Sequence, residues 1–209
     1  MGVSLHYRGR VDAIRHVAVL CTELADIAAV MDWQSTILDD DWQQPANATL
    51  QGIPDHAQIH GHLGLKGIQI TPGSRTESLS FFFDREGNLL SPMNVIMILD
   101  GTLKPEQAWI SVKTQFAPPE IHVWIIGLLK YLKKRYISDL QVSDEGEYWE
   151  TGNIEILKGK MALINEKLTY ISAELSSSRF GDVSGLSAEQ IAARIEQFLL
   201  GGENKNSKQ

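Results

Sequence analysis

The residues best suited to metal chemistry lie in one short segment, Asp55-His56-Ala57-Gln58-Ile59-His60-Gly61-His62. Neutral imidazole nitrogens and a carboxylate are typical ligands of zinc or iron. On a helix, His56 and His60 would share one face, because they are four residues apart. A hydrolase of the H-E-x-x-H type also needs a glutamate directly after the first histidine, and Ala57 stands there. The segment therefore suggests either a divalent-metal site at His56, His60 and His62 or a loop of solvated histidines.

Acidic residues follow two expected strands, at positions 39–41 and 144–147. The two strands of a βαβ unit run parallel, so the ends of its first and second strands meet at one sheet edge. Residues 8 and 10, both arginine, would then lie beside the first acidic group. The charges either pair with one another or, where two carboxylates converge, bind a divalent cation or a cationic ligand. The candidate ligand-binding residues are Arg8, Arg10, Asp39, Asp40, Asp144 and Trp149.

Three tryptophans, Trp33, Trp42 and Trp149, lie next to these acidic turns. Their indoles would either form a ligand pocket or protein contact, or close the ends of the core. A basic stretch at residues 130–135 is interleaved with tyrosines, a composition that can hold single-stranded nucleic acid. Cations are also favoured at a helix C-terminus by the helix dipole. Because the chain carries a net charge of −7, nucleic acid is not an expected partner.

The composition is that of an ordinary globular protein and excludes collagenous and wholly disordered classes. Of the 209 residues, 43% are apolar and 22% are charged. The one cysteine, Cys21, cannot form an intrachain disulfide, which fits a reducing compartment. The longest apolar stretches, residues 95–99 and 123–129, are far shorter than the roughly 18 residues of a membrane span. We therefore expect a cytoplasmic protein without a membrane partner.

Periodicity predicts a strand at residues 5–11 and a helix at 13–33 with Asp12 as its N-cap, followed by a short strand at 34–38. Residues 42–66 have no clean period and read as a long loop. Turn residues then predict an antiparallel meander over 67–71, 78–84 and 89–90. The apolar run at 95–99 fits either a buried strand or a short helix.

A second strand, helix and strand are predicted at residues 109–116, 119–135 and 139–142. An offset of about 105 residues, the spacing of Leu24 and Leu129, aligns this segment with the first one. Both segments end in acidic residues, Asp39 and Asp144. The pattern indicates either an internal duplication, residues 5–42 and 110–147, or two similar βαβ units.

The last part of the chain carries an apolar seam that ends at Leu175. Its spacing of four and three residues is typical of a helix packed on its own domain or, alternatively, of an interface between subunits. Ser187 and Gln190 form a capping-box pattern for a final helix, and a polar tail follows it. The residues of the seam are Leu157, Met161, Ile164, Leu168, Ile171 and Leu175.

Two resemblances accompany these patterns. Residues 109–155, including the run Tyr148-Trp149-Glu150-Thr151-Gly152, resemble an uncharacterised bacterial protein family, to which no activity is attached. The paired layout also resembles, in topology, the duplicated fold of the TATA-binding protein, a curved sheet backed by helices. That resemblance implies no DNA binding, because such binding needs a basic concave face and intercalating aromatics.

Taken together, the sequence predicts an α+β protein with one largely antiparallel sheet covered by helices on one face. We expect one domain over residues 1–178, built of two pseudo-repeats, 1–104 and 105–178, and then a C-terminal helix and disordered tail over 179–209. The chain contains no nucleotide-binding or nucleophile motif. The first functional hypothesis is a non-enzymatic ligand- or protein-binding module that needs no cofactor. The alternative is a metal-assisted hydrolase built on His56, His60 and His62.

Overall fold

The computed structural model describes residues 2–53, 56–73, 75–175, 187 and 190, leaving aside the side chains of residues 53, 56, 167, 168 and 170–175. The chain forms two compact units, residues 1–164 and 165–209, whose boundary falls within the long helix α5 (Ile154–Leu175). The first unit is a mixed α+β structure, as predicted. Its strands pair antiparallel, but they form three sheets and not the single sheet that the sequence predicted.

The first sheet places β1 (Ser4–Arg8) between β8 (Ile110–Lys113) and β9 (Gln141–Asp144). Leu5 and Tyr7 are fully buried on one face of β1, while the side chains between them are more exposed, so the predicted alternation is confirmed. Because β8 and β9 both run antiparallel to β1, they are parallel to each other. The helix α3 (Pro119–Arg135) makes the connection between them.

The second sheet has the order β2 (Gln34–Asp39), β5 (Lys66–Thr71), β6 (Leu79–Phe83) and β7 (Leu89–Leu90), and it contains the predicted meander. A bridge between Arg10 and Asn88 links it to the end of β1. A Cβ atom on Gly67 would lie 2.0 Å from the Phe81 carbonyl oxygen. Only glycine therefore allows β5 and β6 to approach this closely.

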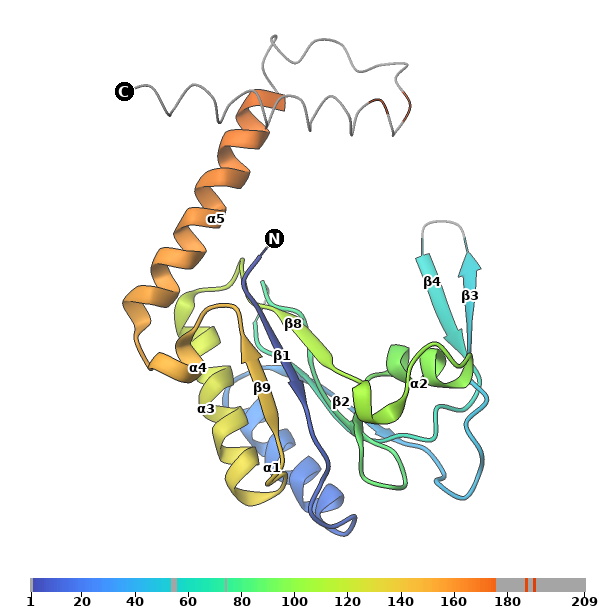
Figure 1. Ribbon diagram of the computed structural model, residues 1–209. Helices are drawn as coiled ribbons and strands as arrows, with labels where there is room; N and C mark the ends of the chain where they lie inside the picture. Colours follow the sequence, from blue (N-terminus) through green and yellow to red (C-terminus); the bar gives the residue numbers. More distant parts are fainter. Residues whose placement is uncertain (1, 54–55, 74, 176–186, 188–189, 191–209) are drawn as a thin grey trace, which may run out of the picture. The chain divides into compact units, whose positions relative to one another are not determined.

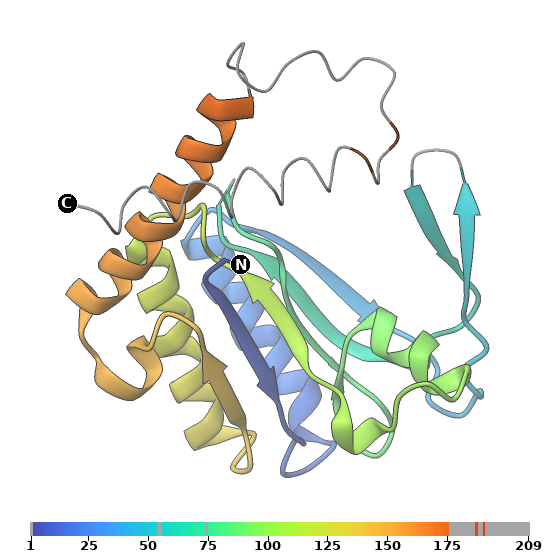
Figure 2. The ribbon, with the colours of Figure 1, turned by 45° about the horizontal axis from the view of Figure 1, so that its top comes forward.

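Two helices, α1 (His16–Val30) and α3, lie side by side against one face of the sheets (Figures 1 and 2). Both helices were predicted from their apolar periodicity. The N-cap prediction was wrong, because α1 begins after Arg15. The Asp12 carboxylate instead accepts hydrogen bonds from Ser138 N at 2.9 Å and Ser138 Oγ at 2.7 Å. It thus ties the chain before α1 to the turn after α3. The main core beneath these helices includes Leu5, Tyr7, Leu20, Leu24, Phe81, Ile125 and Leu129.

The ambiguous apolar run at residues 95–99 belongs to a helix, α2 (Pro92–Leu99). The Ser91 side chain accepts from Asn94 N at 3.1 Å, and Asn94 Oδ1 accepts from Ser91 N at 2.9 Å, a reciprocal cap that starts the helix. A 3₁₀ turn, η1 (Pro105–Gln107), leads from this region to β8. Beside α2 lies a second, smaller core made of Leu65, Phe82, Leu90, Val95 and Ala108.

The segment predicted as a loop, residues 42–66, contains a β-hairpin instead. Its strands are β3 (Thr49–Ile53) and β4 (His56–His60), paired from Thr49 opposite His60 to Ile53 opposite His56. The hairpin forms a two-stranded sheet of its own and projects from the rest of the unit (Figure 1). Its register places Leu50, Gly52, Ala57 and Ile59 on one face and Thr49, Gln51, Gln58 and His60 on the other, so polar and apolar residues do alternate. The glycines and prolines in and around the hairpin led to the prediction of a loop.

The two aligned segments share an order of elements but differ in their strand pairing. Leu24 and Leu129 are both fully buried, each on a helix between two strands. However, β8 and β9 flank β1 in one sheet, whereas β1 and β2 belong to different sheets. The comparison shows no duplication, and the internal repeat stays a prediction.

The short helix α4 (Tyr148–Thr151) leads into α5, which was predicted as the helix with the apolar seam. Leu157 and Met161 are buried against Val3 and pack with Tyr148 within the first unit. The side chains of seam residues 168, 171 and 175 lie outside the described part, as do the link at 176–186 and the predicted domain boundary at 178. In the second unit, Ser187 N donates to Gln190 Oε1 at 2.8 Å, and Gln190 N donates to Ser187 Oγ at 3.3 Å, as expected of the capping box. None of the described helices is long and apolar enough to cross a bilayer.

Candidate functional site

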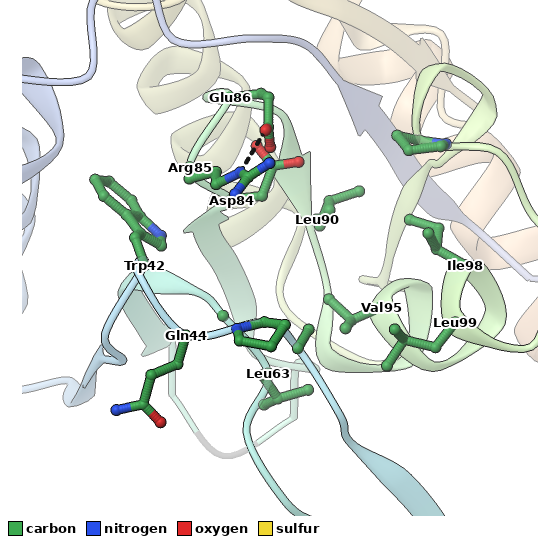
Figure 3. A pocket seen from close by; sticks show the side chains of 14 residues that line it. Trp42, Gln44, Leu63, Asp84, Arg85, Glu86, Leu90, Val95, Ile98 and Leu99 are labelled. Carbon is green, nitrogen blue, oxygen red and sulfur yellow. Dashed lines mark hydrogen bonds and ion pairs between the residues drawn. The ribbon is translucent and has the colours of Figure 1, made fainter.

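An apolar pocket lies beside α2 in the first unit, and we call it the α2 pocket (Figure 3). Its volume is about 360 Å³. Side chains from α2 line one side, and residues 42–46 and 63–64, which flank the β3–β4 hairpin, line the other. Its apolar lining consists of Trp42, Pro45, Ala46, Leu63, Leu90, Val95, Ile98, Leu99 and Pro105.

Hydrogen bonds fix the loop side of the α2 pocket. Trp42 Nε1 donates to the Phe83 carbonyl oxygen at 3.2 Å, so the indole is held against the end of β6. Asp40 Oδ2 accepts from Leu63 N at 3.1 Å and from Leu65 N at 3.4 Å. The carboxylate of Asp40, predicted as a ligand, therefore serves to shape the pocket wall.

The charged rim of the α2 pocket is already occupied by interactions within the chain. Asp84 Oδ1 and Oδ2 accept from Asn88 N and Asn88 Nδ2, both at 2.8 Å, which closes the turn before β7. Arg85 Nε lies 2.6 Å from Glu86 Oε1. The Arg85–Glu86 pair is neutral as a whole, whereas Asp84 keeps its negative charge and is hydrogen-bonded only to uncharged groups of Asn88. The lining of the pocket itself is mainly apolar.

A second hollow of about 220 Å³ lies where β1 ends, and it contains two of the predicted ligand-binding residues, Arg8 and Arg10. The Arg8 guanidinium stacks 4.6 Å from the Trp109 ring centroid, and its Nε and Nη2 donate to Gln141 Oε1. Arg10 Nε donates to the Glu86 carbonyl oxygen at 2.7 Å. These contacts connect strands and turns, so both arginines act in the architecture of the sheet.

The six predicted ligand-binding residues do not meet at one sheet edge. The prediction assumed that the strands before and after α1 are parallel neighbours, but β1 and β2 lie in different sheets. Asp39 pairs with Lys66 Nζ at 2.6 Å and is exposed. Trp149 packs at the edge of the main core, with Lys130 Nζ 5.4 Å from its ring centroid.

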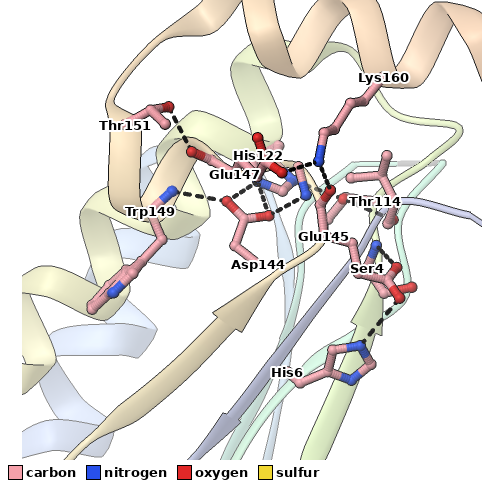
Figure 4. A network of polar contacts seen from close by, with 12 residues as sticks. Ser4, His6, Thr114, His122, Asp144, Glu145, Glu147, Trp149, Thr151 and Lys160 are labelled. Atoms are coloured by element: carbon pink, nitrogen blue, oxygen red, sulfur yellow. Dashed lines mark hydrogen bonds and ion pairs between the residues drawn. The ribbon is translucent and has the colours of Figure 1, made fainter.

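The sixth residue, Asp144, belongs to a buried polar network with Thr114 and His122 (Figure 4). His122 Nε2 lies 3.2 Å from both carboxylate oxygens of Asp144, and His122 Nδ1 lies 2.8 Å from Thr114 Oγ1. The order hydroxyl, imidazole, carboxylate matches that of a hydrolytic triad. Both the His122 and the Asp144 side chains are 0% exposed, however, so no substrate reaches them.

Backbone groups complete the network around Asp144. Gly146 N donates to Oδ1 at 2.6 Å, and Trp149 N donates to Oδ2 at 2.8 Å. Burial acts to raise the pKa of the Asp144 carboxyl, but the hydrogen bond and attraction from His122, with the two backbone donors, hold this pKa below its usual value. Asp144 is thus a buried carboxylate that fixes the turn between β9 and α4.

The predicted metal site does not assemble among the side chains that the structure describes. His60 is exposed on β4, and the His56 side chain is outside the described part. The ring nitrogens of His62 are buried, and neither has a hydrogen-bond partner in the described part of the chain. No cluster of three or more histidine, cysteine, aspartate or glutamate residues suited to a metal occurs in the described part.

Of the residues that line the α2 pocket, the sequence offered only Trp42 as a candidate, because it follows an acidic turn. Its indole was expected either to form a ligand pocket or protein contact or to close an end of the core, and in the structure it also packs against the main core. The residues of α2 went unrecognised as a site because an apolar run gives no sign of which side chains remain accessible. Searches of protein families, curated sequences and solved structures give no match for this chain.

Proposed function

We propose that this protein is a non-enzymatic binding module of the cytoplasm and that the apolar part of its ligand occupies the α2 pocket. The observation that carries the proposal is the pocket's lining, in which nine apolar residues from several separate segments surround about 360 Å³. Small-molecule sites commonly occupy about 300 to 1,000 Å³ and are mainly apolar. A pocket near the lower limit suits one aromatic ring system or one large apolar group.

The electrostatics of the rim support an uncharged ligand group. Asp84 and the Arg85–Glu86 pair are satisfied within the chain, so a charged group entering the pocket would give up hydration without gaining a free partner. An apolar group gains by leaving water, about 25 cal/mol for each Å² that it buries. We therefore expect affinity to follow apolar area.

The rival hypothesis, a metal-assisted hydrolase, derives less support from the geometry. On a strand, His56 and His60 are separated by about 13 Å along the chain, whereas a helix would separate them by about 6 Å. Metal analysis of protein purified without a histidine tag tests this rival. Stoichiometric zinc, iron or manganese, lost in a His60→Ala variant, would favour the hydrolase over the binding module.

The α2 pocket can be tested with N-phenyl-1-naphthylamine, an uncharged apolar dye that fluoresces more strongly out of water. Leu99 lies at the last position of α2 and is 46% exposed, so Leu99→Asp places a charge at the pocket without emptying a core. Val30→Asp is the matched control, because Val30 is the exposed last residue of α1 and does not line the pocket.

We expect the wild-type protein and Val30→Asp to bind the dye equally, and Leu99→Asp to weaken the binding at least about tenfold. Unfolding curves in urea should show a similar stability for the two variants, because both place aspartate at an exposed helix C-terminus. Equal dye binding by all three proteins, or none by the wild type, would contradict the proposal.

A further inference from the structure

A feature separate from the α2 pocket is the outer edge of β2, along which no other strand lies in the part of the chain that the structure describes. This strand has one neighbour, β5, and borders its sheet (Figure 2). Five of its six side chains are exposed, and Ile37 is exposed by 63%. Natural edge strands are usually blunted by lysine, proline, a bulge or a covering segment. Residues 34–38 contain no charge and no proline, and their register with β5 is uninterrupted.

The register shows which main-chain groups of β2 point away from β5. Asp40 N donates to the Leu65 carbonyl oxygen at 3.1 Å, directly after the last strand pair, Asp39 with Lys66. In an antiparallel ladder, hydrogen-bonded pairs alternate with pairs that are not bonded. The even-numbered residues of β2 therefore bond to β5. The N–H and C=O groups of Ser35, Ile37 and Asp39 point outward from the sheet.

The Ile37 side chain lies on the same face as Ile68, which is fully buried, yet it stays in water. The neighbouring part of α1 explains this exposure. The helix α1 contacts β2 directly. Cys21 lies on this side of α1, where burial and then the charge of Asp39 raise the pKa of its thiol. Ala18 and Ala25, three and four residues from Cys21, share that side and are too short to cover an isoleucine.

We propose that β2 pairs antiparallel with β2 of a second copy of this chain, with the two-fold axis at Ile37. The main-chain groups that can bond to a second copy belong to odd-numbered residues only. When odd-numbered residues of two antiparallel copies face each other, the midpoint of the pairing is always a residue, so the two-fold axis passes through a residue and not between two residues. At Ile37, the two exposed isoleucines meet each other, and Ser35 faces Asp39 of the second copy, where its hydroxyl can donate to the carboxylate. About six main-chain hydrogen bonds then join the copies.

The self-complementarity of this register favours a second copy over an unrelated partner. An isologous contact must match each residue with a compatible one from the same patch. In this register no two like charges are opposed: Ile37 faces itself, Thr36 faces Leu38, and Ser35 faces Asp39. If the two-fold axis is perpendicular to the sheet, the two copies form one continuous sheet. Both copies of α1 then lie on the same face of that sheet.

Sedimentation of the full chain over a range of concentrations tests the association. We expect a reversible dimer of twice the 23.3 kDa monomer mass. Ile37→Asp should abolish it by opposing two carboxylates at the axis, whereas Val30→Asp, also an exposed aliphatic residue, should leave it intact. A wild-type monomer up to about 1 mM, or a dimer that survives Ile37→Asp, for example one formed through α5, would overturn the proposal.

Disulfide trapping tests the register. Opposed residues of a hydrogen-bonded pair have Cα atoms about 5.5 Å apart, within the range that a disulfide spans. Ile37→Cys should crosslink two copies under oxidation, whereas Ser35→Cys and Thr36→Cys should not, because each lies away from the axis. The wild type is the control for Cys21, whose thiol has a pKa raised to about 11 by burial and by Asp39. Crosslinking at position 35 or 36 in place of 37 would contradict this register.

Discussion

An active site needs both reactive groups and access for a substrate. The Thr114–His122–Asp144 network has the reactive groups without access, and the α2 pocket has access without such groups. The network has a hydroxyl, an imidazole and a carboxylate in line, but its His122 and Asp144 side chains are 0% exposed. The pocket is accessible and about 360 Å³ in volume, but its lining is mainly apolar and the charged groups on its rim already have hydrogen-bonding partners within the chain. Chemical groups and access are therefore separated between these two regions of the described chain.

The buried network and the α2 pocket should also differ in their contributions to the stability of the fold and to ligand binding. A buried polar network stabilises a fold only while every member keeps its partner. An accessible apolar pocket contributes less to stability, because its walls are partly solvated before any ligand arrives. Substitutions in the network should therefore be costly to the fold, whereas substitutions at the pocket mouth should be costly to binding.

The largest expected effect is that of His122→Ala. The change leaves the buried Asp144 carboxylate without its main side-chain partner, and breaking a buried pair in this way costs about 3 to 5 kcal/mol. The free energy of unfolding in urea measures it. His6→Ala is the control, because His6 lies 3.7 Å from Glu145 in a more exposed pair, which should contribute about 0 to 1 kcal/mol. If His122→Ala and His6→Ala lost equal amounts of unfolding free energy, the buried network would contribute no more to stability than a surface pair, which would contradict the account.

A second prediction concerns pH. The pKa of Asp144 in the folded protein lies below that in the unfolded chain, about 3.9. Its contribution to stability is therefore complete above the unfolded pKa and is lost as the pH falls through the folded pKa. Unfolding in urea from pH 6 to pH 2.5 should show a steeper loss in the wild type than in Asp144→Asn. Parallel curves for the two proteins would mean that folding does not lower the pKa of Asp144.

The smallest effect is expected at the pocket rim. Arg85→Ala removes an exposed ion pair with Glu86, and such pairs contribute about 0 to 1 kcal/mol. The variant should bind N-phenyl-1-naphthylamine within about twofold of the wild type, since apolar contact carries the affinity. Fluorescence titration measures this, and a tenfold loss would show that the rim charge takes part in binding.

The helices and most strands could be predicted because their side chains alternate between buried and exposed positions. Leu20 and Leu24 on α1, and Ile125 and Leu129 on α3, have the spacing of a helix face, and Leu5 and Tyr7 have that of a strand. The β3–β4 hairpin was missed although its residues alternate, with Leu50, Ala57 and Ile59 on one face. Gly52 and Pro54, which are typical of loops, outweighed that short alternation. The α2 run was ambiguous because residues 95–99 are all apolar.

The roles of the two acidic ends were not predictable from their local sequence. Asp39 and Asp144 are each the last residue of a strand, yet Asp39 is exposed beside Lys66 and Asp144 is buried beside His122. The partner decides the role, and His122 lies 22 residues before Asp144 on another element. The α2 pocket poses the same difficulty, since its walls come from residues 42 to 105 and meet only in the folded chain.

The central claim, that binding takes place at the α2 pocket and not at the buried network, is tested most directly by NMR. Titration of ¹⁵N-labelled protein with indole, a small fragment of the expected size, would map the site through amide and side-chain shifts. We predict that the largest shifts occur at the Trp42 indole N–H and at the amides of Leu63, Ile98 and Leu99, with the amides of Thr114 and His122 unchanged. Shifts centred on Thr114, His122 and Asp144, with the Trp42 indole unmoved, would contradict the account.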